Sequence, residues 1–151
     1  MDYEKELELY ISYCGSYCHT CVWFTGEIRR VFREALRTFD EYGLGRRLAG
    51  IIDADAFRDG LVRLSESGIC SGCKAEVKEK PGEDRCKIRQ CAHSKGYLLC
   101  SECPEFPCNM LKSHPGVVKF GCIENLIEIK EKGVENWVKK QWREYVKSMI
   151  R

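Results

Sequence analysis

The spacing of the cysteines constrains this chain more than any other feature of its sequence. The chain has eleven cysteines, and ten of them fall into short groups: Cys14, Cys18 and Cys21; Cys70 and Cys73; Cys86 and Cys91; Cys100, Cys103 and Cys108. Segments such as CSGC at 70–73 bring two sulfurs within reach of one ion. They rarely make relaxed internal disulfides, because disulfide geometry restricts the separation of the two Cα atoms. The ten clustered cysteines are therefore predicted metal ligands.

The composition and the N-terminus indicate a soluble protein of a reducing compartment. The chain is 44% hydrophobic and 32% charged, which is ordinary for a globular domain. The N-terminal segment MDYEKELELYIS carries acidic residues where a signal peptide needs basic ones, and no segment approaches the roughly 20 apolar residues of a membrane span. We expect a cytoplasmic protein, in which thiols remain available as ligands.

Hydrophobic periodicity predicts one α+β domain over residues 1–151, mostly helical, in which a small metal-bound centre packs on long helices. A short strand is expected at 7–11, before the first cysteine group. Apolar positions three and four apart predict a helix after CHTC that ends near Gly43, and a second one from Asp53 or Asp55 to Gly68. Short helices are expected in KIRQCAHSK and CNMLKSH, and two helices in the last third meet at Gly133. The charged segment 74–85 is expected to be an exposed loop.

Coordination chemistry favours zinc in a structural role. Two four-sulfur sites need eight ligands, so ten clustered cysteines leave two over. One workable grouping takes Cys70, Cys73, Cys86 and Cys91 for one site, and Cys100, Cys103 and Cys108 with one of the N-terminal three for the other. Cross-pairing between the groups stays open. A closed four-sulfur shell is structural, because catalytic zinc needs a position for water or substrate.

Four further side chains are of types that can bind zinc, but we assign them other roles. Cys122 has no nearby cysteine in the sequence, so we expect a buried apolar thiol. With ten sulfurs available, the histidines His19, His93 and His114 are not required as ligands.

Net charge does not support nucleic-acid binding. The formal charge of +2 becomes negative once eight thiolates and two zinc ions are counted. The aromatic stripe of Trp137, Trp142 and Tyr145 is interpreted as core and not as a binding surface. A protein partner is compatible with these features, and no enzymatic activity is assigned.

An iron–sulfur protein is the alternative. Cys14, Cys18 and Cys21 have the C-x3-C-x2-C spacing by which radical S-adenosylmethionine enzymes hold a cubane, but their barrel takes about 250 residues with alternating strands and helices. A plain redox cluster stays open, since thiolates serve iron and zinc alike. Thioredoxin-like chemistry at CHTC is disfavoured because no βαβ pattern follows.

The cysteine blocks also resemble a known family. CGSYCHTC at 14–21, CSGC at 70–73, CKIRQCAHSKGYLLCSECPEFPC at 86–108 and KGVENWVKKQW at 132–142 are similar to the prokaryotic cysteine-rich domain of unknown function 3795. The resemblance covers about residues 11–142. It implies a class of protein, with cysteines as metal ligands, and no particular reaction. We therefore expect a metal-binding protein, with zinc the expected metal, that serves as a binding or regulatory module.

Overall fold

The structure is a computed structural model that describes residues 1–66, 70–75 and 86–150. Within these residues the chain is all-α. Extended backbone pairs only at two isolated bridges, Ile11 with Tyr17 and Ala49 with Ile52, and the described segments form no sheet. The predicted α+β class is therefore wrong, although the expectation of a mostly helical chain is correct.

The helices belong to two compact units, which are described separately. Unit 1 comprises Met1–Cys21 and Ser71–Arg151, and unit 2 comprises Val22–Cys70. The helices of unit 1 are α1 (Tyr3–Lys5), the π-helix η1 (Glu6–Tyr10), the 3-10 helices η2 (Cys18–Thr20) and η3 (Cys100–Glu102), α7 (Lys87–Ser94), α8 (Asn109–Ser113), α9 (Pro115–Lys119), α10 (Cys122–Lys132) and α11 (Val134–Met149). Those of unit 2 are α2 (Val22–Thr25), α3 (Glu27–Glu41), α4 (Leu44–Leu48) and α5 (Ala54–Glu66). None of the helices in the described ranges is long and apolar enough to cross a membrane.

The predicted strand at 7–11 is helical instead. Asp2 begins the helix, because its carboxylate accepts a hydrogen bond of 3.1 Å from the backbone N–H of Lys5. The backbone continues through η1, whose last bond joins the Ile11 N–H to the Glu6 carbonyl. Leu7, Tyr10 and Ile11 recur three and four positions apart, which places them on one helical face against the core.

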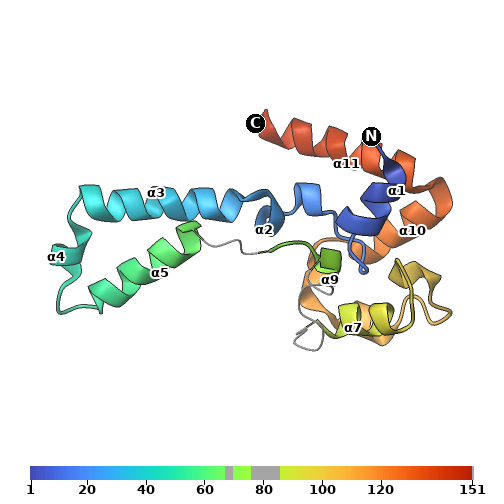
Figure 1. Cartoon of the computed structure of the whole chain (residues 1–151), viewed down its shortest axis with the longest axis horizontal. Helices are drawn as coiled ribbons and strands as arrows, with labels where there is room; N and C mark the ends of the chain where they lie inside the picture. Colours follow the sequence, from blue (N-terminus) through green and yellow to red (C-terminus); the bar gives the residue numbers. More distant parts are fainter. Residues whose placement is uncertain (67–69, 76–85, 151) are drawn as a thin grey trace. The chain divides into compact units, whose positions relative to one another are not determined.

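Unit 2 is a helical hairpin in which α3 and α5 lie side by side and α4 joins them (Figure 1). The predicted end of the first helix is confirmed, since Gly43 has a left-handed φ of 61° just after α3. Asp53 caps α5 as predicted, accepting from Ala56 N–H at 3.0 Å. The rings of Phe39 and Phe57 lie 5.8 Å apart between the helices. The predicted stop at Gly68 lies outside the described residues.

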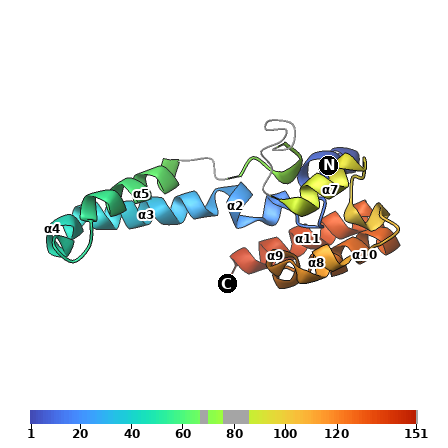
Figure 2. The same cartoon turned by 90° about the horizontal axis from the view of Figure 1, so that it is seen from below.

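The predicted helices of unit 1 are confirmed as α7, α8, α10 and α11 (Figure 2). Gly133, with a φ of 81°, separates α10 from α11 as expected. Trp137 of α11 is completely buried, so its assignment to the core is confirmed. Its indole donates to the side-chain carbonyl of Asn125, 3.4 Å away on α10. Trp142 and Tyr145 lie at the edge of this core and are partly exposed.

Lys74 corrects the prediction of an exposed loop over 74–85. Its side chain is only 4% exposed, and its ammonium donates a hydrogen bond to the carbonyl of Leu7. The same ammonium lies 5.3 Å from the ring centre of Tyr13. Burial lowers the pKa of Lys74 to about 8. Residues 76–85 of the predicted loop lie outside the described residues.

Candidate metal centre

Four cysteines of unit 1 line one small cavity. They are Cys91 on α7, Cys100 at the start of η3, Cys103 just after η3, and Cys108 immediately before α8. The cavity has a volume of about 30 Å³, which is close to the space of one water molecule or one ion. The rest of its wall is mostly apolar and includes Ile88, Ala92, Phe106 and Leu111. No histidine or carboxylate is among the described residues that line it.

The chain presents Cys100 and Cys103 from a tight turn. The Cys103 N–H donates to the Cys100 carbonyl at 3.2 Å, and extended residues flank the turn on both sides. The segment CHTC has the same conformation, with the Cys21 N–H bonded to the Cys18 carbonyl at 3.0 Å. Such turns place two sulfurs on one side of the backbone. The interpretation of these segments as knuckles is thus consistent with their local conformation.

Three further hydrogen bonds hold the η3 turn in place. The carboxylate of Glu102 accepts hydrogen bonds from the backbone N–H groups of Leu98 and Leu99, at 3.2 and 3.1 Å. The Cys100 N–H donates to the carbonyl of Tyr13 at 2.8 Å, which ties the turn to the N-terminal loop. These bonds fix the backbone of the η3 turn, and with it the place of Cys100 at the wall of the cavity.

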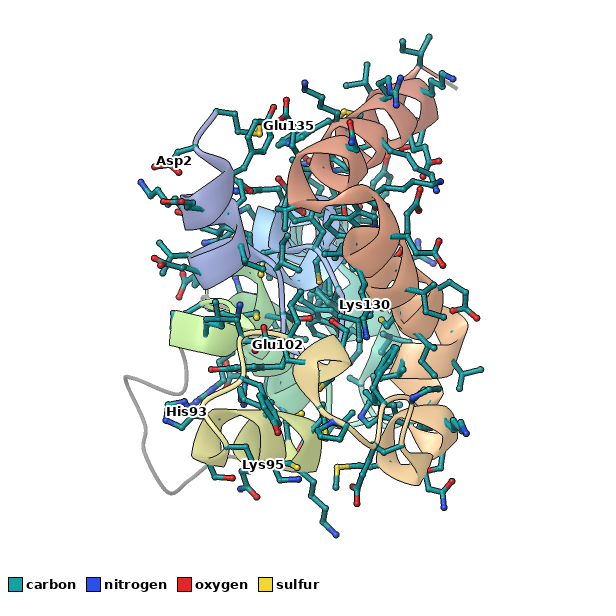
Figure 3. All side chains as sticks on the ribbon, turned by 90° about the vertical axis from the view of Figure 1, so that its right-hand side faces the viewer. Asp2, His93, Lys95, Glu102, Lys130 and Glu135 are labelled. Atoms are coloured by element: carbon teal, nitrogen blue, oxygen red, sulfur yellow. The ribbon has the colours of Figure 1, made fainter. Side chains whose placement is uncertain are left out.

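The electrostatics of the cavity reflect the crowding of its sulfurs. Burial raises the pKa of Cys100 to about 12, and the sulfurs of Cys14, Cys108, Cys91 and Cys103 add to the effect. Lys95, also on the wall, has its pKa raised by the charges of Cys91 and Cys103. Figure 3 shows Lys95 and His93 at the α7 end of unit 1, opposite Asp2 and Glu135. A cation bound among the sulfurs reverses this preference for protonated thiols.

Cys14 faces a different set of groups. Its sulfur lies 3.3 Å from the hydroxyl of Ser12 and 3.8 Å from that of Ser16, and the Ser16 hydroxyl also lies 3.2 Å from the sulfur of Cys122. The Cys122 contact lowers the pKa of Cys14, against the opposing effect of burial. The same contact, together with burial, raises the pKa of Cys122. Cys14 influences Cys100 electrostatically but does not line the cavity.

The remaining predicted ligands are distributed around unit 1 and the end of unit 2. Cys18 is buried at the start of η2, and both its charge and that of Cys73 act on the Lys74 ammonium. Cys86 caps the N-terminus of α7 and packs against the core. Cys21 follows η2, and Cys70 is the last residue of unit 2.

These positions change the predicted grouping of the cysteines. Cys91 lies with Cys100, Cys103 and Cys108, whereas one of the groupings left open by the sequence placed it with Cys70, Cys73 and Cys86. Within the described residues, no three His, Cys, Asp or Glu side chains converge closely enough to hold an ion as they stand. The four thiols at the cavity match a tetrahedral sulfur site in number and chemistry.

The histidines have contacts outside this cavity. His114 accepts from the Val117 N–H at 3.4 Å and so caps α9. His93 lies 3.5 Å from the hydroxyl of Tyr13. His19 lies between the rings of Tyr10 and Trp142.

The model of the family described as "Protein of unknown function (DUF3795)" matches residues 10–113, which is more than half of the chain. The chain belongs to this family. The DUF3795 match includes all ten clustered cysteines and ends before α10, so Cys122 lies beyond it. No curated protein and no solved structure matches the chain.

Sequence reasoning missed Cys122 and Lys74 as neighbours of the clustered cysteines. Cys122 is far from Cys14 along the chain, and the spacing of the cysteines carries no signal for a contact of that range. Lys74 stands in a charged segment, where a solvated side chain is the ordinary expectation. Both contacts arise from the packing of unit 1.

Proposed function

We propose that this protein binds one metal ion, with zinc the expected ion, through Cys91, Cys100, Cys103 and Cys108, and that the ion is structural. The observation that carries the proposal is that four cysteines from three separate segments line one small cavity. Sulfur ligands without carboxylate or water suit zinc or iron in preference to magnesium or calcium.

The surroundings of the cavity support a structural ion. A four-thiolate shell leaves no coordination position for water or substrate. When bound, the ion would supply a cross-link between α7, the η3 turn and the start of α8. Lys95 at the wall offsets part of the negative charge of four thiolates. We propose that the protein acts as a binding or regulatory module, in the cytoplasm, where its thiols stay reduced.

Elemental analysis of two variants tests the proposal. Protein purified without oxygen is expected to contain zinc, and Cys103→Ser is expected to lose about one zinc per chain relative to the wild type. Cys122→Ser is the matched control, because its thiol lies outside the cavity, and it is expected to retain all of its zinc. Equal metal content in wild type and Cys103→Ser contradicts the proposal. Iron with a broad absorption near about 400 nm supports the iron–sulfur alternative instead.

A further inference from the structure

A groove of unit 1, here called the α11 groove, lies along the C-terminal helix α11. It has a volume of about 620 Å³, within the range of about 300–1,000 Å³ that is usual for ligand sites. Residues of α11 form much of its lining, and the N-terminal segment and α10 supply the rest. None of these residues lines the cavity proposed to hold the metal, so the α11 groove is a separate site.

The lining of the α11 groove is mainly positive. It includes the cationic side chains of Lys132, at the end of α10, and of Lys139, Lys140 and Arg143 on α11. Among the described residues, the lining contains one carboxylate, that of Glu128. Position 143 lies on the same face of α11 as positions 139 and 140, because it follows them by four and three residues. The α11 groove is therefore suited to an anionic ligand.

Two glutamates hold the lysines on different flanks of the α11 groove. Glu128 on α10 accepts hydrogen bonds from Lys140 at 2.7 Å and from Lys132 at 3.0 Å. Lys139 donates to Glu135 at 2.5 Å, and its ammonium lies over a ring of α1. Lys140 thus lies toward α10 and Lys139 toward α1. Each ammonium has further N–H donors beyond these bonds, so the lysines can still bind a ligand.

Arg143 is the cation most open to a ligand. It is exposed, and its side chain makes no hydrogen bond or ion pair with any residue in the described part of the chain. A guanidinium binds a carboxylate through two parallel N–H donors. With Glu135 included, the groove has four positive charges and two negative ones, so the excess stays positive.

The aromatic rings at the α11 groove are engaged within the protein. The ammonium of Lys139 lies 5.9 Å from the ring centre of Tyr3. The ring of Trp142 stacks on that of His19, with centroids 5.8 Å apart, and its indole N–H donates to the Tyr17 hydroxyl at 3.1 Å. Recognition therefore depends on charge. This favours a chain of carboxylates over a nucleic acid, whose bases bind by stacking on open rings.

We propose that the α11 groove binds an acidic peptide segment of a partner protein. Arg143 contacts one carboxylate of the segment, and Lys139 and Lys140 contact others. Because these two lysines lie toward different flanks, a segment with several Asp or Glu residues reaches both, and the positive excess of the groove matches its charge. This inference rests on the proposed role as a binding module, and it does not depend on the metal site.

The experiment measures the fluorescence anisotropy of labelled hexaglutamate mixed with the full chain, as purified with its metal. Hexaglutamate is expected to bind, more weakly as salt is added, whereas hexaglutamine is expected not to bind. Arg143→Gln and Lys140→Gln are each expected to weaken binding by about two- to fivefold, and the double variant by about tenfold. Arg143→Lys keeps the charge and is expected to bind within about twofold of the wild type.

Lys130→Gln is the matched control. It removes the same charge from an exposed position of α10 that does not line the α11 groove, and it is expected to bind hexaglutamate as the wild type does. Arg143→Gln is expected to keep the helical circular dichroism of the wild type, because Arg143 makes no side-chain bond within the described residues. A loss of binding in this variant therefore reports on the groove and not on folding.

Three outcomes overturn the proposal. They are the absence of hexaglutamate binding, equal weakening by Lys130→Gln and Arg143→Gln, and tighter binding of labelled hexathymidylate than of hexaglutamate. The last result identifies a nucleic-acid surface instead. The zinc content of Arg143→Gln is expected to equal that of the wild type, so failure of peptide binding is distinguishable from failure of the metal site tested with Cys103→Ser.

Discussion

The hydroxyl of Tyr17 donates a hydrogen bond of 2.6 Å to the carboxylate of Glu6, and both side chains are buried. The indole of Trp142 donates to the same hydroxyl at 3.1 Å, so the C-terminal helix α11 is joined to the N-terminal segment through Tyr17. Nε2 of His19 lies 3.5 Å from the same carboxylate oxygen of Glu6. Tyr17 immediately precedes Cys18 of the CHTC segment. Its hydrogen bonds to Glu6 and Trp142 therefore tie this segment to the core.

Tyr17→Phe is expected to destabilise the protein by about 1–3 kcal/mol, because it leaves the Glu6 carboxylate and the Trp142 N–H without their shared partner. Urea unfolding followed by tryptophan fluorescence measures the change. Tyr145→Phe, whose ring is at the edge of the core, is the control and is expected to change stability by less than about 0.5 kcal/mol. Equal stability of the two variants contradicts this account of the Tyr17 hydroxyl.

The same residue predicts a dependence of stability on alkaline pH. Burial, followed by the hydrogen bond to Glu6, raises the pKa of Tyr17 above its ordinary value of 10.0. The folded state therefore retains the phenolic proton at pH values where the unfolded state releases it, and stability falls as pH rises above about 10. Tyr17→Phe is expected to lose less stability than the wild type between pH 9 and about 11. Parallel curves for the two proteins contradict the shift.

Gly15→Ala is expected to cost about 2–4 kcal/mol, since it adds backbone strain at a positive φ to a clash with the Cys122 carbonyl. Gly43→Ala is the matched control, because Gly43 also has a positive φ of 61° but a Cβ there would meet only the side chain of Arg46, at an ordinary contact distance of 3.5 Å. It is expected to cost about 1 kcal/mol. The difference between their unfolding free energies isolates the close approach of loop 12–16 to α10, and a difference near zero argues against that approach.

Removal of the proposed ion is expected to lower Tm by at least about 5 °C, because binding free energy at a structural site is folding free energy. The effect is expected to be local. Amide hydrogen exchange is expected to accelerate over 97–108, around the η3 turn, and to stay unchanged in the α3–α5 hairpin. An unaltered Tm after verified loss of metal contradicts a structural ion.

Lys95→Gln is expected to weaken zinc binding by about two- to fivefold, the range typical of one exposed charge pair. Its pKa is raised by the sulfurs of Cys91 and Cys103, so its positive charge acts on the ligands. Lys112→Gln, on α8 but not on the wall of the cavity, is expected to bind zinc as the wild type does. Competition with a coloured chelator measures both affinities, and equal weakening in the two variants removes the specific role of Lys95.

Much of the helical structure could be predicted, because its signals are local. Apolar spacing and a terminal glycine located α3, and the Asp53 cap located the start of α5. The segment 7–11 was predicted wrongly, since four apolar residues within five positions fit either a strand or one turn of helix. The Asp2 cap and the packing of Ile11 in the core decide between these in favour of the helix.

The sequence by itself predicted the short turns of CHTC and CSEC, because a C-x-x-C segment limits the separation of its own two cysteines. The tertiary structure alone decided which segments meet. It brought Cys91 to the cavity of Cys100, Cys103 and Cys108, and it placed the sulfurs of Cys14 and Cys122 near the same Ser16 hydroxyl. The physical reason is that these contacts depend on how α7, α10 and the N-terminal loop pack around Trp137 and Leu126. The packing of a shared core depends on many side chains at once, and no local spacing encodes it.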